Sequence, residues 1–137
     1  MNLYLDASVL VPLFVSEARS DDAQARLQGR ALFISDLAAA EFSAAISRRV
    51  RTGDLGFEQA PAVFAAFDAW SARAANRVPL EAGDLLSTIA LVRRLDLHLR
   101  TADAANLAIA QRLGAEVFTF DKKMAEAARA LGLAVQS

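Results

Sequence analysis

The sequence contains no cysteine. Disulfide bonds and thiolate metal sites are therefore unavailable, which excludes zinc ribbons, iron–sulfur clusters and cysteine nucleophiles together. Long hydrophobic runs are also absent, because the longest apolar stretch, residues 7–15, is interrupted by Ser8 and Pro12 and is far shorter than a membrane span. The N-terminal region has neither the basic segment nor the cleavage site of an export signal. We therefore expect a soluble, cytoplasmic protein without a membrane segment.

The chain also has almost no net charge, with a formal value of −1. It therefore lacks the overall basic character that is typical of domains binding nucleic acid over a broad surface. Its basic residues are nevertheless clustered, since Arg48 and Arg49 are adjacent and the only two lysines are Lys122 and Lys123. These pairs are candidates for local contacts with RNA phosphates, although an ordinary solvated surface is the commoner reason for any one pair.

Short apolar runs alternate with longer helical patterns along the 137 residues, of which 55% are hydrophobic. Length and composition favour one compact domain over residues 1–137. Strands are predicted at residues 2–5, 31–34, 116–120 and 133–135. Helices are predicted at residues 8–15, 20–28, 37–52, 57–75, 81–94, 104–113 and 122–131. This alternation predicts an α/β fold with a parallel sheet of four to five strands and helices on both faces.

Four acidic residues, Asp6, Glu41, Asp103 and Asp121, lie where these elements could bring them together. Asp6 and Asp121 each follow a predicted strand, and ligands of open parallel sheets bind outside the carboxyl ends of the strands. Thr119, two residues before Asp121, should point to the same side. Glu41 lies on a small apolar face of its helix and needs a partner there. Asp103 immediately precedes another predicted helix.

Each acid alone also has an ordinary structural explanation. Asp103 and Asp121 could be helix N-caps, and Glu41 could pair with Arg48 on nearly the same edge of its helix. Gathered in one cleft, however, two carboxylates about 5 Å apart would repel by roughly 3 kcal/mol at an effective dielectric constant near 20. A divalent cation would relieve this repulsion, and ligands that are all oxygen favour Mg²⁺ or Mn²⁺ over zinc. Such a site suits phosphodiester hydrolysis by a metal-activated water.

Three segments of the chain resemble the PIN-domain nucleases, and within them the VapC-like toxins of type II toxin–antitoxin pairs. The opening LYLDASVLVPLF is similar to the strand that delivers the family's first acid, here Asp6, followed by a hydroxyl, here Ser8. The segment ISDLAAAEFSAAISRRVRTG is similar to the stretch with the helical acid, here Glu41, and a basic residue downstream, here Arg48.

The third segment, LRTADAANLAIAQRLGAEVFTFDKKMAEAARALGL, resembles the C-terminal signature of the family. It places Asp103 and Asp121 as the third and fourth acids, with Thr119 as a hydrogen-bonding support. The resemblance implies a three-layer α/β/α fold and Mg²⁺- or Mn²⁺-dependent cleavage of RNA. It also implies a homodimer and inhibition by a cognate, VapB-like antitoxin.

Other interpretations remain open at this point. Ser8 could orient a metal-bound water or cap the helix that follows it, and the lone His98 is more readily explained as a structural residue than as a general base. An apolar stripe at helical spacing is best explained by core or partner-interface packing, and comprises Phe57, Ala60, Val63, Phe64, Phe67 and Trp70. The chain could also be a non-catalytic PIN-fold scaffold. A phosphatase with Asp6 as nucleophile is disfavoured, because Ser8 occupies the position where such enzymes usually have a second aspartate.

Overall fold

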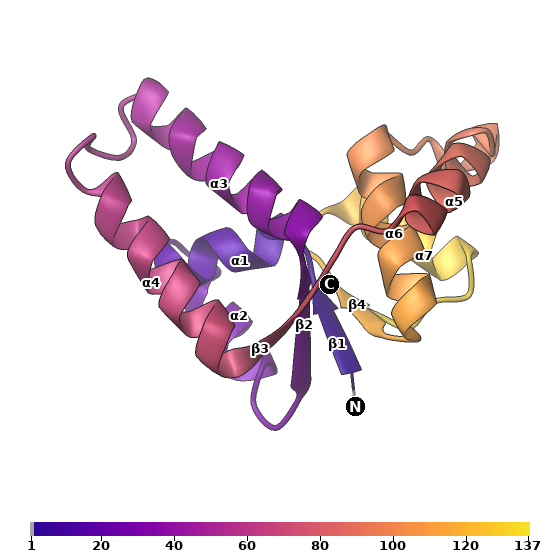
Figure 1. Cartoon of the computed structure of the whole chain (residues 1–137), viewed down its shortest axis with the longest axis horizontal. Helices are drawn as coiled ribbons and strands as arrows, with labels where there is room; N and C mark the ends of the chain where they lie inside the picture. The colour runs from indigo at the N-terminus through magenta and orange to yellow at the C-terminus, as the bar shows by residue number, and fades with distance from the viewer. Residues whose placement is uncertain (1) are drawn as a thin grey trace.

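The computed structural model describes residues 2–137, in which a parallel sheet is covered by helices on both faces (Figure 1). The sheet has the order β3-β2-β1-β4-β5, and every neighbouring pair is parallel. Its five strands are β1 (Asn2–Leu5), β2 (Ala31–Ser35), β3 (Ala75–Val78), β4 (Glu116–Phe118) and β5 (Val135–Gln136). This arrangement confirms the predicted three-layer α/β fold.

The helices divide into two layers, with α1 to α4 on one face of the sheet and α5 to α7 on the other (Figure 1). The first layer comprises α1 (Ala7–Phe14), α2 (Ser20–Arg26), α3 (Asp36–Arg51) and α4 (Ala60–Ala74). The second comprises α5 (Ala82–Val92), the short 3₁₀ helix η1 (Leu95–Leu97), α6 (Thr101–Leu113) and α7 (Lys122–Ala130). No helix within residues 2–137 is long and apolar enough to cross a membrane.

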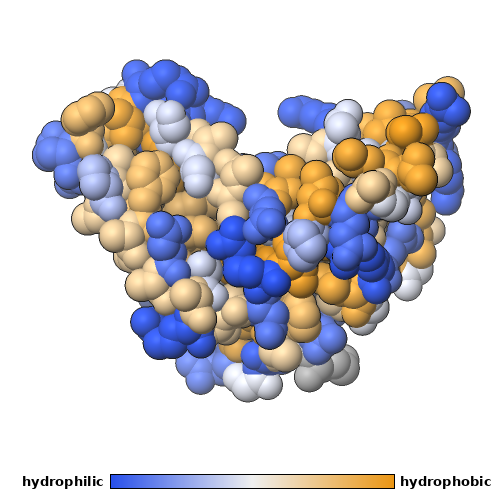
Figure 2. All heavy atoms as spheres, viewed as in Figure 1, coloured by the Kyte–Doolittle hydropathy of each residue, from blue (hydrophilic) through white to orange (hydrophobic). Residues whose placement is uncertain are grey.

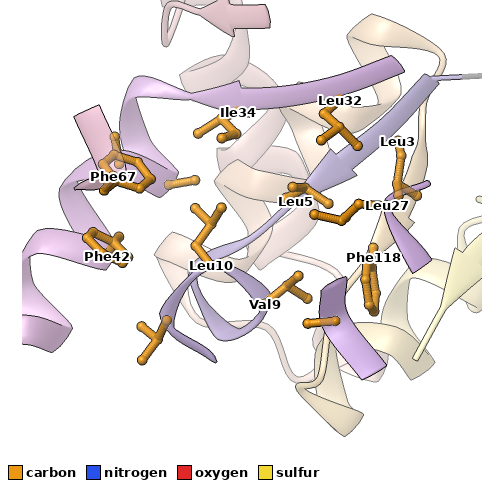
Figure 3. Packing of buried hydrophobic residues seen from close by; sticks show 14 of the residues in the cluster. Leu3, Leu5, Val9, Leu10, Leu27, Leu32, Ile34, Phe42, Phe67 and Phe118 are labelled. Carbon is orange, nitrogen blue, oxygen red and sulfur yellow. The ribbon is translucent and has the colours of Figure 1, made fainter. Parts of the chain in front are cut away.

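Two hydrophobic cores form because successive strand residues point to opposite faces of the sheet. Leu3 and Leu5 of β1 pack with the first helical layer, whereas Tyr4 between them packs with the second. Figure 3 shows the first core, where α3 and α4 meet through Phe42 and Phe67. These two rings are stacked with centroids 4.2 Å apart, and burying one such side chain stabilises the fold by about 1.5–3 kcal/mol. This contact holds α3, the helix that carries Glu41.

The edge strand β3 was not predicted, because its sequence ANRV has no apolar run and its two central residues are exposed. It belongs to the sheet through its pairing with β2, and the Asn76 amide also donates a hydrogen bond to the Leu32 carbonyl at 3.0 Å. The predicted helix 57–75 begins instead at Ala60, and Phe57 lies outside it with 83% of its surface exposed. The packing interpretation of the stripe is confirmed at Phe67, which is buried, but not at Phe57.

Candidate functional site

The carboxylate of Asp6 is fixed directly after the central strand β1. It is 6% exposed, and its two oxygens accept hydrogen bonds from Ser8 Oγ at 2.6 Å and Thr119 Oγ1 at 2.8 Å. Backbone amides orient both hydroxyls, since the N–H of Phe120 donates to Ser8 and that of Asp121 donates to Thr119. Ser8 therefore supports Asp6 directly, and its interpretation as a helix cap is wrong, because α1 has Asp6 at its N-cap position.

Burial raises the pKa of Asp6 to about 6. The hydrogen bonds from Ser8 and Thr119 oppose this rise, while the negative charges of Glu41 and Asp121 add to it. The ionised form of Asp6 is thus destabilised, both by lost solvation and by the other acids of the predicted site.

A chain of hydrogen bonds through the second core holds Glu41. Its Oε1 accepts a hydrogen bond from Asn106 Nδ2 at 2.7 Å, and the same amide nitrogen donates to the Ala102 carbonyl. The Asn106 carbonyl oxygen accepts the proton of the Tyr4 hydroxyl, whose oxygen lies 2.7 Å from Ser35 Oγ. Because that proton is already donated to Asn106, the Ser35 hydroxyl must donate to Tyr4. Glu41 is therefore anchored to β1, β2 and α6 at once.

Sequence analysis did not identify Tyr4, Ser35 or Asn106, which are all buried. A polar amide inside the apolar run NLAIA of α6 was the available signal, because a buried amide requires partners. The expected pairing of Glu41 with Arg48 is wrong. An amide from α6 occupies that position, and Arg48 is exposed and lines a different pocket.

Glu41, Asp103 and Asp121 line one pocket of about 220 Å³. Burial raises the pKa of Glu41, with a further contribution from the charge of Asp103. Burial likewise raises the pKa of Asp103, with a further contribution from Asp121. The three carboxylates therefore influence one another electrostatically, and two of them also raise the pKa of Asp6. The predicted convergence of these acids on one region of the fold is reflected in this pocket and in these interactions.

Asp103 and Asp121 were both considered as helix N-caps, and only Asp121 is one. Asp121 is the N-cap of α7, and its side chain accepts a hydrogen bond from the Met124 N–H at 3.1 Å. Asp103 is not an N-cap, because α6 begins earlier, at Thr101, after the extended backbone of Arg100. Asp103 instead lies in the first helical turn and is free to face the pocket.

The carboxylate oxygens of this pocket suit a hard divalent cation, but they do not form a closed cage. Within residues 2–137 no group of three or more His, Asp or Glu side chains is close enough to hold an ion as the side chains stand. Mg²⁺ is usually bound by only one or two carboxylates and keeps several waters, so it does not require such a cage. The residues therefore fit an ion of this type bound in an open, hydrated site.

The basic residues considered for RNA contact lie in different places. Arg48 and Arg49 line a pocket of about 520 Å³ that also includes Ser8, and Arg49 is paired with Glu17 at 2.7 Å. Lys123 lines the acidic pocket itself. Lys122 is exposed at the first position of α7 and lines neither of these two pockets.

Three positive or potentially positive side chains border the acidic pocket, namely His98, Arg100 and Lys123. His98 is exposed, and its backbone has the left-handed conformation, with φ 52° and ψ 39°. His98 is therefore not a buried core histidine, and it ends the 3₁₀ helix η1. Sequence analysis missed Arg100, which gave no signal beyond its position three residues before Asp103.

Comparison with known sequences places this chain in one family. The chain belongs to the PIN domain family, whose sequence model matches residues 3–130. It is 37% identical over 144 aligned positions to ribonuclease VapC46 of Mycobacterium tuberculosis, covering 97% of this chain and 95% of that protein. It is 32% identical over 127 positions to ribonuclease VapC3 of Pyrobaculum aerophilum, covering 92% and 94%. The resemblance to VapC-like PIN-domain ribonucleases is confirmed.

Solved structures share the fold at lower sequence identity. The toxin VapC20 of Mycobacterium tuberculosis, described as cleaving the sarcin–ricin loop, superimposes with a TM-score of 0.73 at 20% identity, covering 96% of this chain and 95% of that one. The structure of VapBC2 of Rickettsia felis, bound to a DNA fragment from its promoter, gives a TM-score of 0.71 at 15% identity, covering 99% of this chain and 98% of that one.

Proposed function

We propose that this protein is a Mg²⁺- or Mn²⁺-dependent endoribonuclease, the toxin of a toxin–antitoxin pair that acts in the cytoplasm. The observation that carries the proposal is the pocket lined by Glu41, Asp103 and Asp121, together with the buried Asp6 whose pKa two of these acids raise. The VapC ribonucleases to which the chain is at least 32% identical support the same activity.

In this proposal Asp6, Glu41, Asp103 and Asp121 hold the cation. When bound, the cation would supply an activated water and stabilise the charge that develops on the phosphate. Ser8 and Thr119 orient the Asp6 carboxylate through the two hydrogen bonds that it accepts. Asn106 fixes one oxygen of Glu41 and leaves the other available for the cation or its water shell. Arg48, Arg49, Lys122 and Lys123 are the candidates for contact with RNA phosphates.

A phosphatase mechanism with Asp6 as the nucleophile finds no support in the geometry. Both carboxylate oxygens accept short hydrogen bonds, and the side chain is 6% exposed, so neither oxygen is open to an incoming phosphate. Each oxygen accepts one of these hydrogen bonds and keeps a further lone pair, which could still bind a small cation.

The partners in this proposal are a VapB-like antitoxin and a second copy of the chain. The antitoxin is supported by a solved toxin–antitoxin complex that shares the fold. For the homodimer we assign the outer face of α5, where Leu85, Leu86 and Ile89 are 49%, 70% and 49% exposed. Figure 2 shows hydrophobic atoms gathered over this helix, and contiguous exposed apolar surface of this kind is typical of protein interfaces.

The experiment that tests the activity is cleavage of total cellular RNA by antitoxin-free protein in Mg²⁺, in Mn²⁺ and in EDTA. We expect discrete fragments in the two metals and none in EDTA, and we expect the variants Asp6→Asn and Asp103→Asn to cut at least about a hundredfold more slowly. Asp68→Asn, an exposed position on α4, is the matched control and should cut like the wild type. Wild-type rates in Asp6→Asn would refute the ligand assignment. Inactivity of a metal-binding preparation on every RNA tested would favour the scaffold alternative.

A further inference from the structure

A second pocket adjoins the acidic one and shares part of its wall. It has a volume of about 570 Å³ and lies between η1 and α7. His98 and Lys123 line both pockets. The two cavities therefore meet at these two side chains, which places the second pocket directly beside the proposed site of cleavage.

We propose that this second pocket binds a nucleoside monophosphate unit of the RNA strand, next to the phosphate that is cut. In this subsite the ring of His98 stacks on the base and the ammonium group of Lys123 contacts the phosphate. The inference rests on the proposed ribonuclease activity and names a substrate subsite for it.

The size and lining of the pocket fit such a unit. Pockets that hold small ligands have volumes of roughly 300–1,000 Å³ and combine apolar walls with a few polar groups. Here Leu97, Ala127 and Ala130 supply apolar wall, and Lys123 supplies the positive charge. RNA bases in single-stranded segments are commonly stacked on aromatic side chains, histidine included. A nucleotide thus matches both parts of the lining.

Two carboxylates also line the second pocket, and they bear on its charge. Asp96 forms an ion pair with Arg94 at 2.8 Å, so its charge is compensated within η1 and the turn before it. Glu126 is exposed on α7 and lines only the second pocket, whereas Lys123 lines both pockets. The boundary between the two pockets is therefore the positive part of this surface, where a phosphate that joins two nucleotides would lie.

The backbone of His98 supports a role for its ring. Apart from glycines, it is the one residue within 2–137 with a positive φ, a conformation that is uncommon outside glycine. Glycine or asparagine would make the same turn with less strain. A histidine at this position adds an aromatic ring at the shared wall of two pockets, and stacking on a base gives that ring a use.

The test uses the fact that His98 is the only histidine of the chain, so its imidazole gives a single set of NMR signals. The full-length protein is titrated in EDTA with adenosine 5′-monophosphate and, separately, with ribose 5-phosphate and inorganic phosphate. We expect adenosine 5′-monophosphate to move the imidazole C–H signals upfield through ring stacking, and the two compounds without a base to leave them nearly in place. Lys123→Gln should weaken the binding of the nucleotide about tenfold, whereas Arg73→Gln, an equal charge change on α4, should not.

A cleavage assay on RNA extends the test from a free nucleotide to the strand. His98→Asn keeps a residue suited to the turn and removes the ring, so KM should rise about tenfold while kcat changes less than about twofold. If wild-type protein cuts RNA but the nucleotide does not move the His98 signals, the subsite is refuted and the ribonuclease proposal stands. If the signals move and no cleavage occurs in any metal, the proposed function fails and the nucleotide site remains. A tenfold loss of kcat without a change in KM would also overturn the subsite.

Discussion

Replacing Asp6 with asparagine should stabilise the metal-free protein at neutral pH while abolishing cleavage. Burial, together with the charges of Glu41 and Asp121, raises the folded-state pKa of Asp6 from its ordinary value of 3.8 to about 6. A carboxylate whose folded pKa is raised favours folding only while it is protonated. The stability that protonated Asp6 contributes is fully present below pH 3.8 and is lost as the pH rises through about 6. Ionised Asp6 therefore opposes folding at pH 7 and above.

The size of this effect follows from the separation of the two pKa values. At roughly 1.4 kcal/mol per pH unit, the difference between 3.8 and about 6 corresponds to about 3 kcal/mol at pH 8. Asparagine removes that cost but donates and accepts differently toward Ser8 and Thr119, which loses about 1 kcal/mol of hydrogen bonding. The net gain should be about 1–2 kcal/mol, which for a chain of this length raises Tm by about 5 °C.

Urea and thermal unfolding of wild type and Asp6→Asn in EDTA, from pH 4 to pH 8, measures this gain directly. The stability difference should be largest at pH 7–8 and should shrink or reverse near pH 4, where wild-type Asp6 is protonated. Asp68→Asn serves as the control for a surface carboxylate and should show no such profile. An Asp6→Asn protein that is less stable than wild type at pH 8 in EDTA would refute the reasoning, because it would mean that ionised Asp6 contributes favourably to the metal-free fold.

Three further outcomes are expected. Mg²⁺ at about a hundred times its Kd should stabilise wild type by about 2.7 kcal/mol in thermal unfolding but leave Asp6→Asn nearly unchanged, and equal stabilisation of both would argue against Asp6 as a ligand. Asn106→Leu removes the donor to Glu41 and leaves the buried Tyr4 hydroxyl without its acceptor. The variant should lose about 2–4 kcal/mol of unfolding free energy in urea and most of its kcat. An unchanged kcat would show that Glu41 needs no anchor. Leu86→Glu should convert a dimer to a monomer in size-exclusion chromatography with light scattering while the far-UV circular dichroism spectrum stays the same, and a persisting dimer would place the interface elsewhere.

The sequence was most informative where a local pattern and burial agree. β1, β2 and β4 were predicted because central parallel strands are buried on both faces and are therefore continuously apolar. The edge strand β3 is half-exposed and polar, so it leaves no such pattern and is recognised only from its pairing with β2. The two ends of α6 differ in the same way. Its C-terminus is marked by Gly114, which has a positive φ, whereas its N-terminus has no side-chain cap.

The positions of the four acids and the support from Thr119 were predictable, whereas the anchor of Glu41 was not. Asp6 and Asp121 follow strands, and this alone directs them to the carboxyl edge of the sheet. Arg48, on the same helix, was the predicted partner of Glu41. The observed partner is Asn106, which lies 65 residues further along the chain. Hydrogen bonds between distant elements depend on how helices pack, and a single sequence contains no local pattern for that packing.

The alternation of β1 explains why Asp6 and the anchor of Glu41 lie close together. Asp6 has an extended backbone, with φ −92° and ψ 174°, so it continues the alternation of the strand and points to the same face as Tyr4. Leu3 and Leu5 point to the opposite face and are completely buried in the first core. A slip of β1 by one residue would place leucines against Asn106 and bury Asp6 among apolar side chains, at a cost far above that of any single hydrogen bond. The hydrophobic pattern of a four-residue strand thus sets the register of two of the four acids, Asp6 directly and Glu41 through Tyr4 and Asn106.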